Sequence, residues 1–216
     1  MDKETSRNFT AEDIIKSPFS DSIKKINELN WQDISIEDRC NMAEELTGIY
    51  VSFKNIALGK DGNKLKQKYA IGAPSKGMDV ITTMIKIKIF SRTASNTPWI
   101  TMNQIINHIR SKGGMYSDVS RDTINRRVNR LIKRGEVSKI NTSELKEQDI
   151  KKIAHHRSFK YVYRASDETV SYLIRGELSA SEIAPLGTFI NHMKNFIKLL
   201  PTNEKNKLIS ELIESD

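Results

Sequence analysis

Residues 120–137 of this 216-residue chain, SRDTINRRVNRLIKRGEV, carry the pattern that decides the fold. Ser120 is a favourable N-cap residue, and Gly135 suits the left-handed conformation that follows a last helical residue. The pattern therefore predicts a helix from Arg121 to Arg134. Its apolar residues fall within about a quarter-turn of one another. They form the expected buried stripe: Ile124, Val128, Leu131 and Ile132.

The opposite face of this predicted helix is polar and basic. It carries Asp122, Arg126, Asn129, Arg130 and Lys133, with Arg121, Thr123 and Asn125 on its shoulders near the N-terminus. Arginine can bond O6 and N7 of guanine together, and asparagine can bond N6 and N7 of adenine. The face therefore has the side chains that reading the major groove of DNA requires. A basic face that is merely solvated is the alternative interpretation.

Two more helices are expected before this one. Thr101 and Gln104 have the spacing of a capping box, and an apolar pattern with helical spacing continues from there to Gly113. Trp99 and Ile100, just upstream, form a short apolar stub. Residues 78–92 are expected to form the first helix of the unit. Their core, IKIKIF, alternates with a period of two, so a strand is a competing interpretation.

Two strands are expected after the basic helix. Residues 136–140 alternate polar and apolar side chains, and residues 158–163, SFKYVY, can pair back onto them as an antiparallel hairpin. Some 17 residues, 141–157, separate these strands, whereas hairpin loops usually have about 2–5. Helix, turn, helix, strand, long loop and strand is the order of a winged helix-turn-helix. The predicted fold class is mainly α with a small β-hairpin wing and with helices at both ends.

Two segments resemble one family of regulators. SRDTINRRVNRLIKRGEV resembles the recognition helix of the MarR and GbsR-like regulators, and KYVYRAS, residues 160–166, resembles their closing wing strand. The resemblance covers roughly residues 78–214. It implies a winged helix-turn-helix transcription regulator that dimerises through its terminal helices, and it leaves a small-molecule effector open. The family's wing is shorter and has an Asp-x-Arg tip, which Asp149 and Arg157 are too far apart to match.

The excess positive charge of the chain is concentrated in this region. Residues 99–164 hold 15 Lys and Arg against 6 Asp and Glu, a net of +9, whereas the rest of the chain has 20 against 21. Such a concentration is typical of a surface that binds a polyanion. We predict sequence-specific binding of double-stranded DNA. The predicted contact residues are Ser120, Arg121, Thr123, Asn125, Arg126, Asn129, Arg130, Lys133, Lys139, Lys151, Lys152, His155, His156, Arg157 and Lys160.

The long wing loop has two parts of different charge. Residues 143–149, SELKEQD, lean acidic and are expected to face solvent. The basic end, from Lys151 to Arg157, is expected to contact the phosphate backbone or to reach into a minor groove.

Amphipathic helices are expected on both sides of this unit. Ser35 and Asp38 begin a helix that continues to Gly59, and residues 60–77 form a basic connector. A solvated linker competes with DNA backbone contact for that connector. Downstream, Asp167 is expected to cap one helix and Ser181 the next, with Pro185 in its first turn.

The helix after Ser181 carries an apolar seam with steps of three and four residues. The seam consists of Ile183, Leu186, Ile190, Met193, Ile197 and Leu200. A regular seam needs a partner helix, and we expect it to hold a homodimer that presents two recognition helices to DNA. Packing within the same chain is the alternative.

Four regions follow from these patterns: a polar arm over 1–34, a helix and connector over 35–77, the winged helix-turn-helix over 78–166, and a helical dimerisation region over 167–216. Cys40 is the single cysteine, the four histidines are scattered, and nucleotide-binding glycine motifs are absent. We therefore expect no enzyme activity, no metal site and no cofactor.

We also expect no membrane span and a cytoplasmic, nucleoid-associated protein. A partition or replication-initiation protein, or a protein–protein adaptor, is the alternative to a transcription regulator. An adaptor would more often show apolar residues where Arg126, Asn129 and Arg130 stand.

Overall fold

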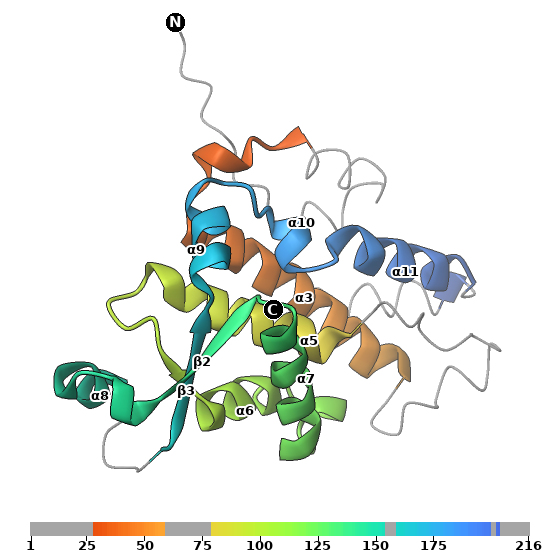
Figure 1. Ribbon diagram of the computed structural model, residues 1–216. Coiled ribbons are helices and arrows are strands. Elements are labelled where there is room, and N and C mark those ends of the chain that lie inside the picture. The colour runs from red at the N-terminus through yellow and green to blue at the C-terminus, as the bar shows by residue number, and fades with distance from the viewer. Residues whose placement is uncertain (1–27, 59–78, 154–158, 200–201, 204–216) are drawn as a thin grey trace, which may run out of the picture.

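Helices make up most of the structure, and a three-stranded antiparallel sheet lies to one side of them (Figure 1). This computed structural model describes residues 28–58, 79–153, 159–199 and 202–203. The elements in chain order are η1 (Trp31–Asp33), α3 (Ile36–Leu58), α5 (Val80–Phe90), η2 (Ser91–Ala94), β1 (Ile100–Thr101), α6 (Met102–Arg110), η3 (Gly114–Tyr116), α7 (Arg121–Lys133), β2 (Val137–Asn141), η4 (Thr142–Glu144), α8 (Glu147–Ile153), β3 (Tyr161–Ala165), α9 (Asp167–Ile174), α10 (Ala180–Ile183) and α11 (Leu186–Leu199).

Helix α5 occupies the centre of the core. It packs against α3, α6, α7, α10 and β3, so apolar side chains are buried on most of its faces. This environment explains the IKIKIF pattern, because a helix surrounded by other elements needs no single apolar stripe. The expected helix is confirmed and the competing strand is wrong. Asp79 caps the helix, and its Oδ1 accepts a hydrogen bond from the Thr82 backbone N–H at 3.2 Å.

The helix boundaries expected around α6 and α7 are confirmed. Thr101 and Gln104 form the reciprocal capping box at the start of α6. The Ser120 hydroxyl accepts a hydrogen bond from the Thr123 backbone N–H at 3.2 Å and begins α7. Gly135 follows α7 with φ of 73°, a conformation that glycine adopts without strain.

Strand β3 lies in the middle of the sheet, between β1 and β2. The predicted antiparallel hairpin is confirmed, with Lys139 opposite Tyr163 and Val137 opposite Ala165. The second strand begins three residues later than expected, at Tyr161. Residues 100–101, which belong partly to the expected apolar stub, instead form the edge strand β1, with Ile100 opposite Tyr163. This pairing joins segments about 60 residues apart, so local sequence patterns do not reveal it.

The long connection between β2 and β3 contains the short helix α8 at the far end of the hairpin (Figure 1). Ile153 of α8 is buried, whereas the neighbouring Lys151 and Lys152 are exposed. The Thr142 hydroxyl donates a hydrogen bond to the carbonyl of Phe159 at 2.8 Å and closes the connection at its base. The stretch expected to be a loop is therefore largely a folded insertion.

Two helix starts after the hairpin correct the expected ones. Ser166, not Asp167, caps α9, and its hydroxyl accepts a hydrogen bond from the Thr169 N–H at 3.1 Å. Ser179, not Ser181, caps α10, which ends at Ile183. The expected helix through Pro185 does not form, because proline disfavours helical geometry at the preceding residue, Ala184. Ala184 is extended, and α11 begins at Leu186.

The apolar seam expected between two subunits packs inside the chain. Ile183, Leu186, Ile190 and Met193 are each no more than 3% exposed, and both α10 and α11 contact α3. On α3, Tyr50 stacks on Phe189 with ring centroids 4.3 Å apart. The partner of the seam is therefore α3 of the same chain, which corrects the expected intersubunit contact. Ile197 is half-buried, and Leu200 lies outside the described residues.

The remaining expectations concern the helix after Ser35, the N-terminal arm and the basic connector. Helix α3 confirms the helix expected after Ser35, whose hydroxyl accepts a hydrogen bond from the Asp38 N–H at 3.0 Å. Most of the expected N-terminal arm, the connector over 60–77 and, within the expected C-terminal region, residues 200–201 and 204–216 lie outside the described residues.

Buried Arg39 joins the start of α3 to the end of α9. Its guanidinium donates hydrogen bonds to the carbonyl oxygens of Leu173 and Leu178, the latter at 2.7 Å. Gly176, with φ of 73°, follows α9 so closely against Gln32 that a Cβ atom would lie 2.6 Å from the Gln32 Cα. The chain thus closes onto its own N-terminal helix at this point.

Candidate nucleic-acid interface

Helix α7 is fixed by one apolar stripe, which leaves its other side in solvent. Ile124, Val128 and Leu131 are fully buried, and Ile132 is half-buried beside them. The stripe packs against α5, α6 and β2. The predicted stripe is confirmed, and it determines which side chains of α7 point outward.

The outward side of α7 carries six exposed polar or charged side chains, which we call the α7 face. They are Arg121, Asp122, Arg126, Asn129, Arg130 and Lys133, so one carboxylate stands among four basic groups. Thr123 and Asn125 are half-buried at the edge of this face. The structure thus brings these predicted residues together on one helix surface.

Short-range contacts order the first turns of the α7 face. Arg121 donates to the Asn103 Oδ1 atom at 3.3 Å, which links the start of α7 to the start of α6. The Ser120 hydroxyl donates to the Thr123 hydroxyl at 3.0 Å in addition to its capping role. Ser120 is therefore exposed but occupied as a cap, and its structural role is well defined.

One carboxylate contacts two arginines of α7. Oδ2 of Asp79 lies 2.9 Å from Nε of Arg127 and 3.7 Å from Nη1 of Arg130. Arg127 was not among the predicted contact residues, because it lies between the buried stripe and the α7 face. A second carboxylate, Glu136, lies 3.8 Å from Arg134 and 3.0 Å from Lys86 of α5.

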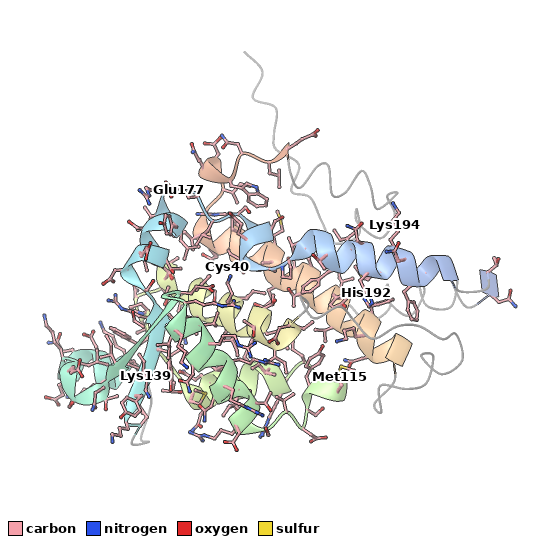
Figure 2. The ribbon with its side chains drawn as sticks, turned by 45° about the vertical axis from the view of Figure 1, so that its right-hand side comes forward. Cys40, Met115, Lys139, Glu177, His192 and Lys194 are labelled. Carbon is pink, nitrogen blue, oxygen red and sulfur yellow. The ribbon has the colours of Figure 1, made fainter. Side chains whose placement is uncertain are left out.

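The hairpin adds an aromatic ring with two lysines beside it. Nζ of Lys139 lies 3.8 Å from the centroid of the Tyr161 ring, and Nζ of Lys160 lies 5.4 Å from it. A cation beside an aromatic face is attracted by the ring quadrupole, so these contacts hold both lysines near the strands. Figure 2 shows Lys139 on the hairpin, on a different side of the molecule from His192 and Lys194 of α11.

The remaining predicted contact residues lie farther along the insertion. Lys151 pairs with Glu147 one turn earlier on α8, with 2.8 Å between Nζ and Oε1, and Lys152 is exposed. His155, His156 and Arg157 lie outside the described residues.

The two described histidines lie away from the α7 face, against α3. His108 of α6 has a pKa lowered to about 4 because burial disfavours the charged ring, although Glu44 nearby opposes the shift. His192 of α11 also has a lowered pKa because of burial, and its Nδ1 lies 2.9 Å from the Tyr50 hydroxyl oxygen. Across the described ranges, no cluster of three or more histidine, cysteine or acidic side chains is arranged to hold a metal ion.

Sequence reasoning missed Asp79, Asn103, Arg127 and Tyr161 as parts of this surface. Asp79 stands directly before the apolar pattern of α5, so its role as an N-cap has a local signal. Its contact with α7 has none, because 48 residues separate Asp79 from Arg127 and tertiary packing alone brings them together.

No helix within the described ranges is long and apolar enough to cross a membrane. Comparisons with protein-family models, with curated proteins and with solved structures found no match to this chain.

Proposed function

We propose that residues 79–166 form a winged helix-turn-helix that binds double-stranded DNA and that the protein is a transcription regulator. One observation carries the proposal. On α7 the apolar residues are all turned inward, and Arg126, Asn129 and Lys133 are exposed together on the opposite side. A helix of this kind fits the major groove, where arginine and asparagine distinguish guanine and adenine from other bases.

The interface divides into two kinds of contact in this proposal. Arg126 and Asn129 read base edges, because both are exposed on the outward side of α7 and their side chains can bond guanine and adenine. Lys139 and Lys160 lie beside Tyr161 on the hairpin and contact phosphates, which fixes the register of α7 in the groove. The second class raises affinity for every sequence and carries the salt dependence of binding.

The test begins with selection of bound sequences from a random duplex pool. Binding of the selected duplex and of a scrambled duplex is then measured for the wild type and for Arg126→Ala and Asn129→Ala. Each substitution should cost about 1–3 kcal/mol on the selected duplex and much less on the scrambled one. Lys139→Ala should weaken both duplexes about equally and flatten the salt dependence.

Lys194→Ala is the matched control, because Lys194 lies on α11, away from the α7 face (Figure 2). It should leave both affinities unchanged. Equal losses on the two duplexes for the Arg126 and Asn129 variants would remove these residues from base reading. A wild-type chain that binds no duplex would contradict the proposal as a whole.

The length of the protected DNA reports how many copies bind. A homodimer on a palindromic site places two recognition helices about 34–36 Å apart, one DNA turn. Such a dimer needs an interface other than the seam of α11, since that seam is covered by α3.

A further inference from the structure

Asp79 combines a capping role with a charge that faces α7. Its Oδ1 atom caps α5 by accepting from the Thr82 N–H at 3.2 Å, while its Oδ2 atom contacts Arg127 at 2.9 Å and Arg130 at 3.7 Å. Capping needs an acceptor oxygen and no charge, and asparagine caps helices as well as aspartate does. The negative charge of Asp79 therefore acts on Arg127 and Arg130 of α7 in addition to its effects on the N-terminal dipole of α5 and on Lys54 of α3.

The contact is open to solvent on the side of the two arginines. The side chains of Asp79, Arg127 and Arg130 are 25%, 29% and 50% exposed. The three groups together carry one net positive charge, where the arginines alone would carry two. Solvent-exposed ion pairs are weak, so the carboxylate restrains the two guanidinium groups without fixing them permanently.

The pairing of Asp79 with the two arginines should affect phosphate contacts and base contacts differently. Each phosphate that a protein neutralises releases counterions and adds to binding of every sequence. Arg126 and Asn129, which are exposed on α7 and have no ion pair with Asp79 among the described contacts, contribute to base reading in the proposed complex. A carboxylate that occupies Arg127 and Arg130 thus lowers sequence-independent binding and spares the base readers.

We propose that Asp79 is a specificity-determining residue of the interface: it withholds Arg127 and Arg130 from the phosphate backbone and so limits binding to DNA of any sequence. The inference rests on the proposed function. It concerns the balance between two classes of contact at that site.

Asp79→Asn tests this role, because asparagine keeps the capping oxygen and removes the charge. Duplex affinity is measured from about 50 to 200 mM salt with the selected and the scrambled duplex. The slope of log K against log salt should become steeper by about 0.9–1.8, the value for one or two additional phosphates. Affinity for the scrambled duplex should rise about 3- to 10-fold at about 0.1 M salt, and the ratio of selected to scrambled affinity should fall.

Glu177→Gln is the matched control. It also removes one carboxylate charge beside an arginine, since Glu177 lies 3.1 Å from Arg175, but it lies beyond α9 rather than at α7 (Figure 2). It should leave the salt slope and both affinities unchanged. An equal effect of the two substitutions would show that the overall charge matters, and it would overturn the role of Asp79.

A variant that lacks both arginines tests whether Asp79 acts through Arg127 and Arg130. In a chain that carries Arg127→Ala and Arg130→Ala, adding Asp79→Asn should no longer change the salt slope. A slope that still steepens would overturn the inference, as would an unchanged or shallower slope for Asp79→Asn alone. Circular dichroism melting verifies that each variant is folded. If the wild type binds DNA and Asp79→Asn binds it with the same affinities and salt slope, this inference alone is refuted. If the wild type binds no duplex, the proposed function is refuted as well.

Discussion

Helices α7 and α11 have similar lengths, 13 and 14 residues, and both are amphipathic, yet the structure uses them differently. For both, the sequence predicted a partner outside the chain: DNA for α7 and a second subunit for α11. The apolar side of α11 packs against α3 of the same chain, while the basic side of α7 stays in solvent. Any nearby apolar surface can cover an apolar stripe, whether it belongs to the same chain or to a second subunit. A cluster of arginines cannot be buried without a large desolvation cost, so its exposure is the safer inference.

One aspartate placed in each helix should have very different effects on stability. Ile190→Asp puts a carboxylate at a position that is 1% exposed, between α11 and α3. It should lower the free energy of unfolding by at least about 4 kcal/mol, because an apolar contact is lost and a charge is buried. Asn129→Asp on the exposed α7 face should change stability by about 0.5 kcal/mol or less.

Urea unfolding followed by circular dichroism measures the stability of both variants. Titration with the selected duplex measures their affinity for DNA. Asn129→Asp should remain folded and lose duplex affinity, because in the proposed complex the new carboxylate would face phosphate and base edges. If Ile190→Asp instead gave a folded protein of native stability, the seam would not belong to the core of the chain. The expected intersubunit contact would then return.

Two glycines, one after α7 and one after α9, differ in the space around them. Gly135 after α7 and Gly176 after α9 share φ of 73°, so alanine costs about 1–2 kcal/mol at either position. A Cβ at Gly135 meets nothing within 4 Å, whereas one at Gly176 lies 2.6 Å from the Gln32 Cα. Gly176→Ala should therefore lose about 1–3 kcal/mol more than Gly135→Ala. Equal urea midpoints for the two variants would show that η1 does not pack closely on the end of α9.

The pH dependence of stability should come in part from His108 and His192, the two histidines that lie against α3. Burial lowers the pKa of His108 to about 4, so the folded chain keeps this ring neutral. The unfolded chain protonates it below about pH 6.5, and the stability that the neutral ring contributes is present above that pH and lost as the pH falls towards 4. Between pH 7.5 and pH 5 the loss from this group is about 2 kcal/mol.

His108→Gln should reduce that loss, measured as the difference between urea midpoints at the two pH values. His192, whose pKa is lowered in the same direction, accounts for part of the remainder. A pH dependence identical in the variant and the wild type would mean that His108 is accessible to protons in the folded chain.

Local signals in the sequence were sufficient for much of the fold. The Thr101–Gln104 capping box, the Ser120 cap and Gly135 all act within one helical turn, and the structure confirms each of them. The same kind of signal misled at Ser181, because the effect of Pro185 on Ala184 ended one helix and began another.

Contacts between segments far apart in the chain were not predicted from the sequence. The pairing of β1 with β3 and the buried contact of Arg39 with Leu173 and Leu178 involve residues far apart in the chain. For the candidate interface, the sequence predicted the α7 face but missed the contact of Asp79 with Arg127. The helical wheel reports which side of one helix is polar, and it contains no information on which other element stands beside that side.

The amino-acid sequence alone was enough to predict where helices start and stop around α7, which residues of α7 are apolar, and that the surplus of positive charge lies within residues 99–164. These properties depend on neighbours within one or two turns. The packing of α3 over the seam of α11, and the contact of Asp79 with two arginines of α7, became known from the three-dimensional structure. Both contacts depend on which surfaces meet when the whole core packs. An apolar stripe or a single carboxylate can pair with many different partners, so its pattern in the sequence does not identify the partner.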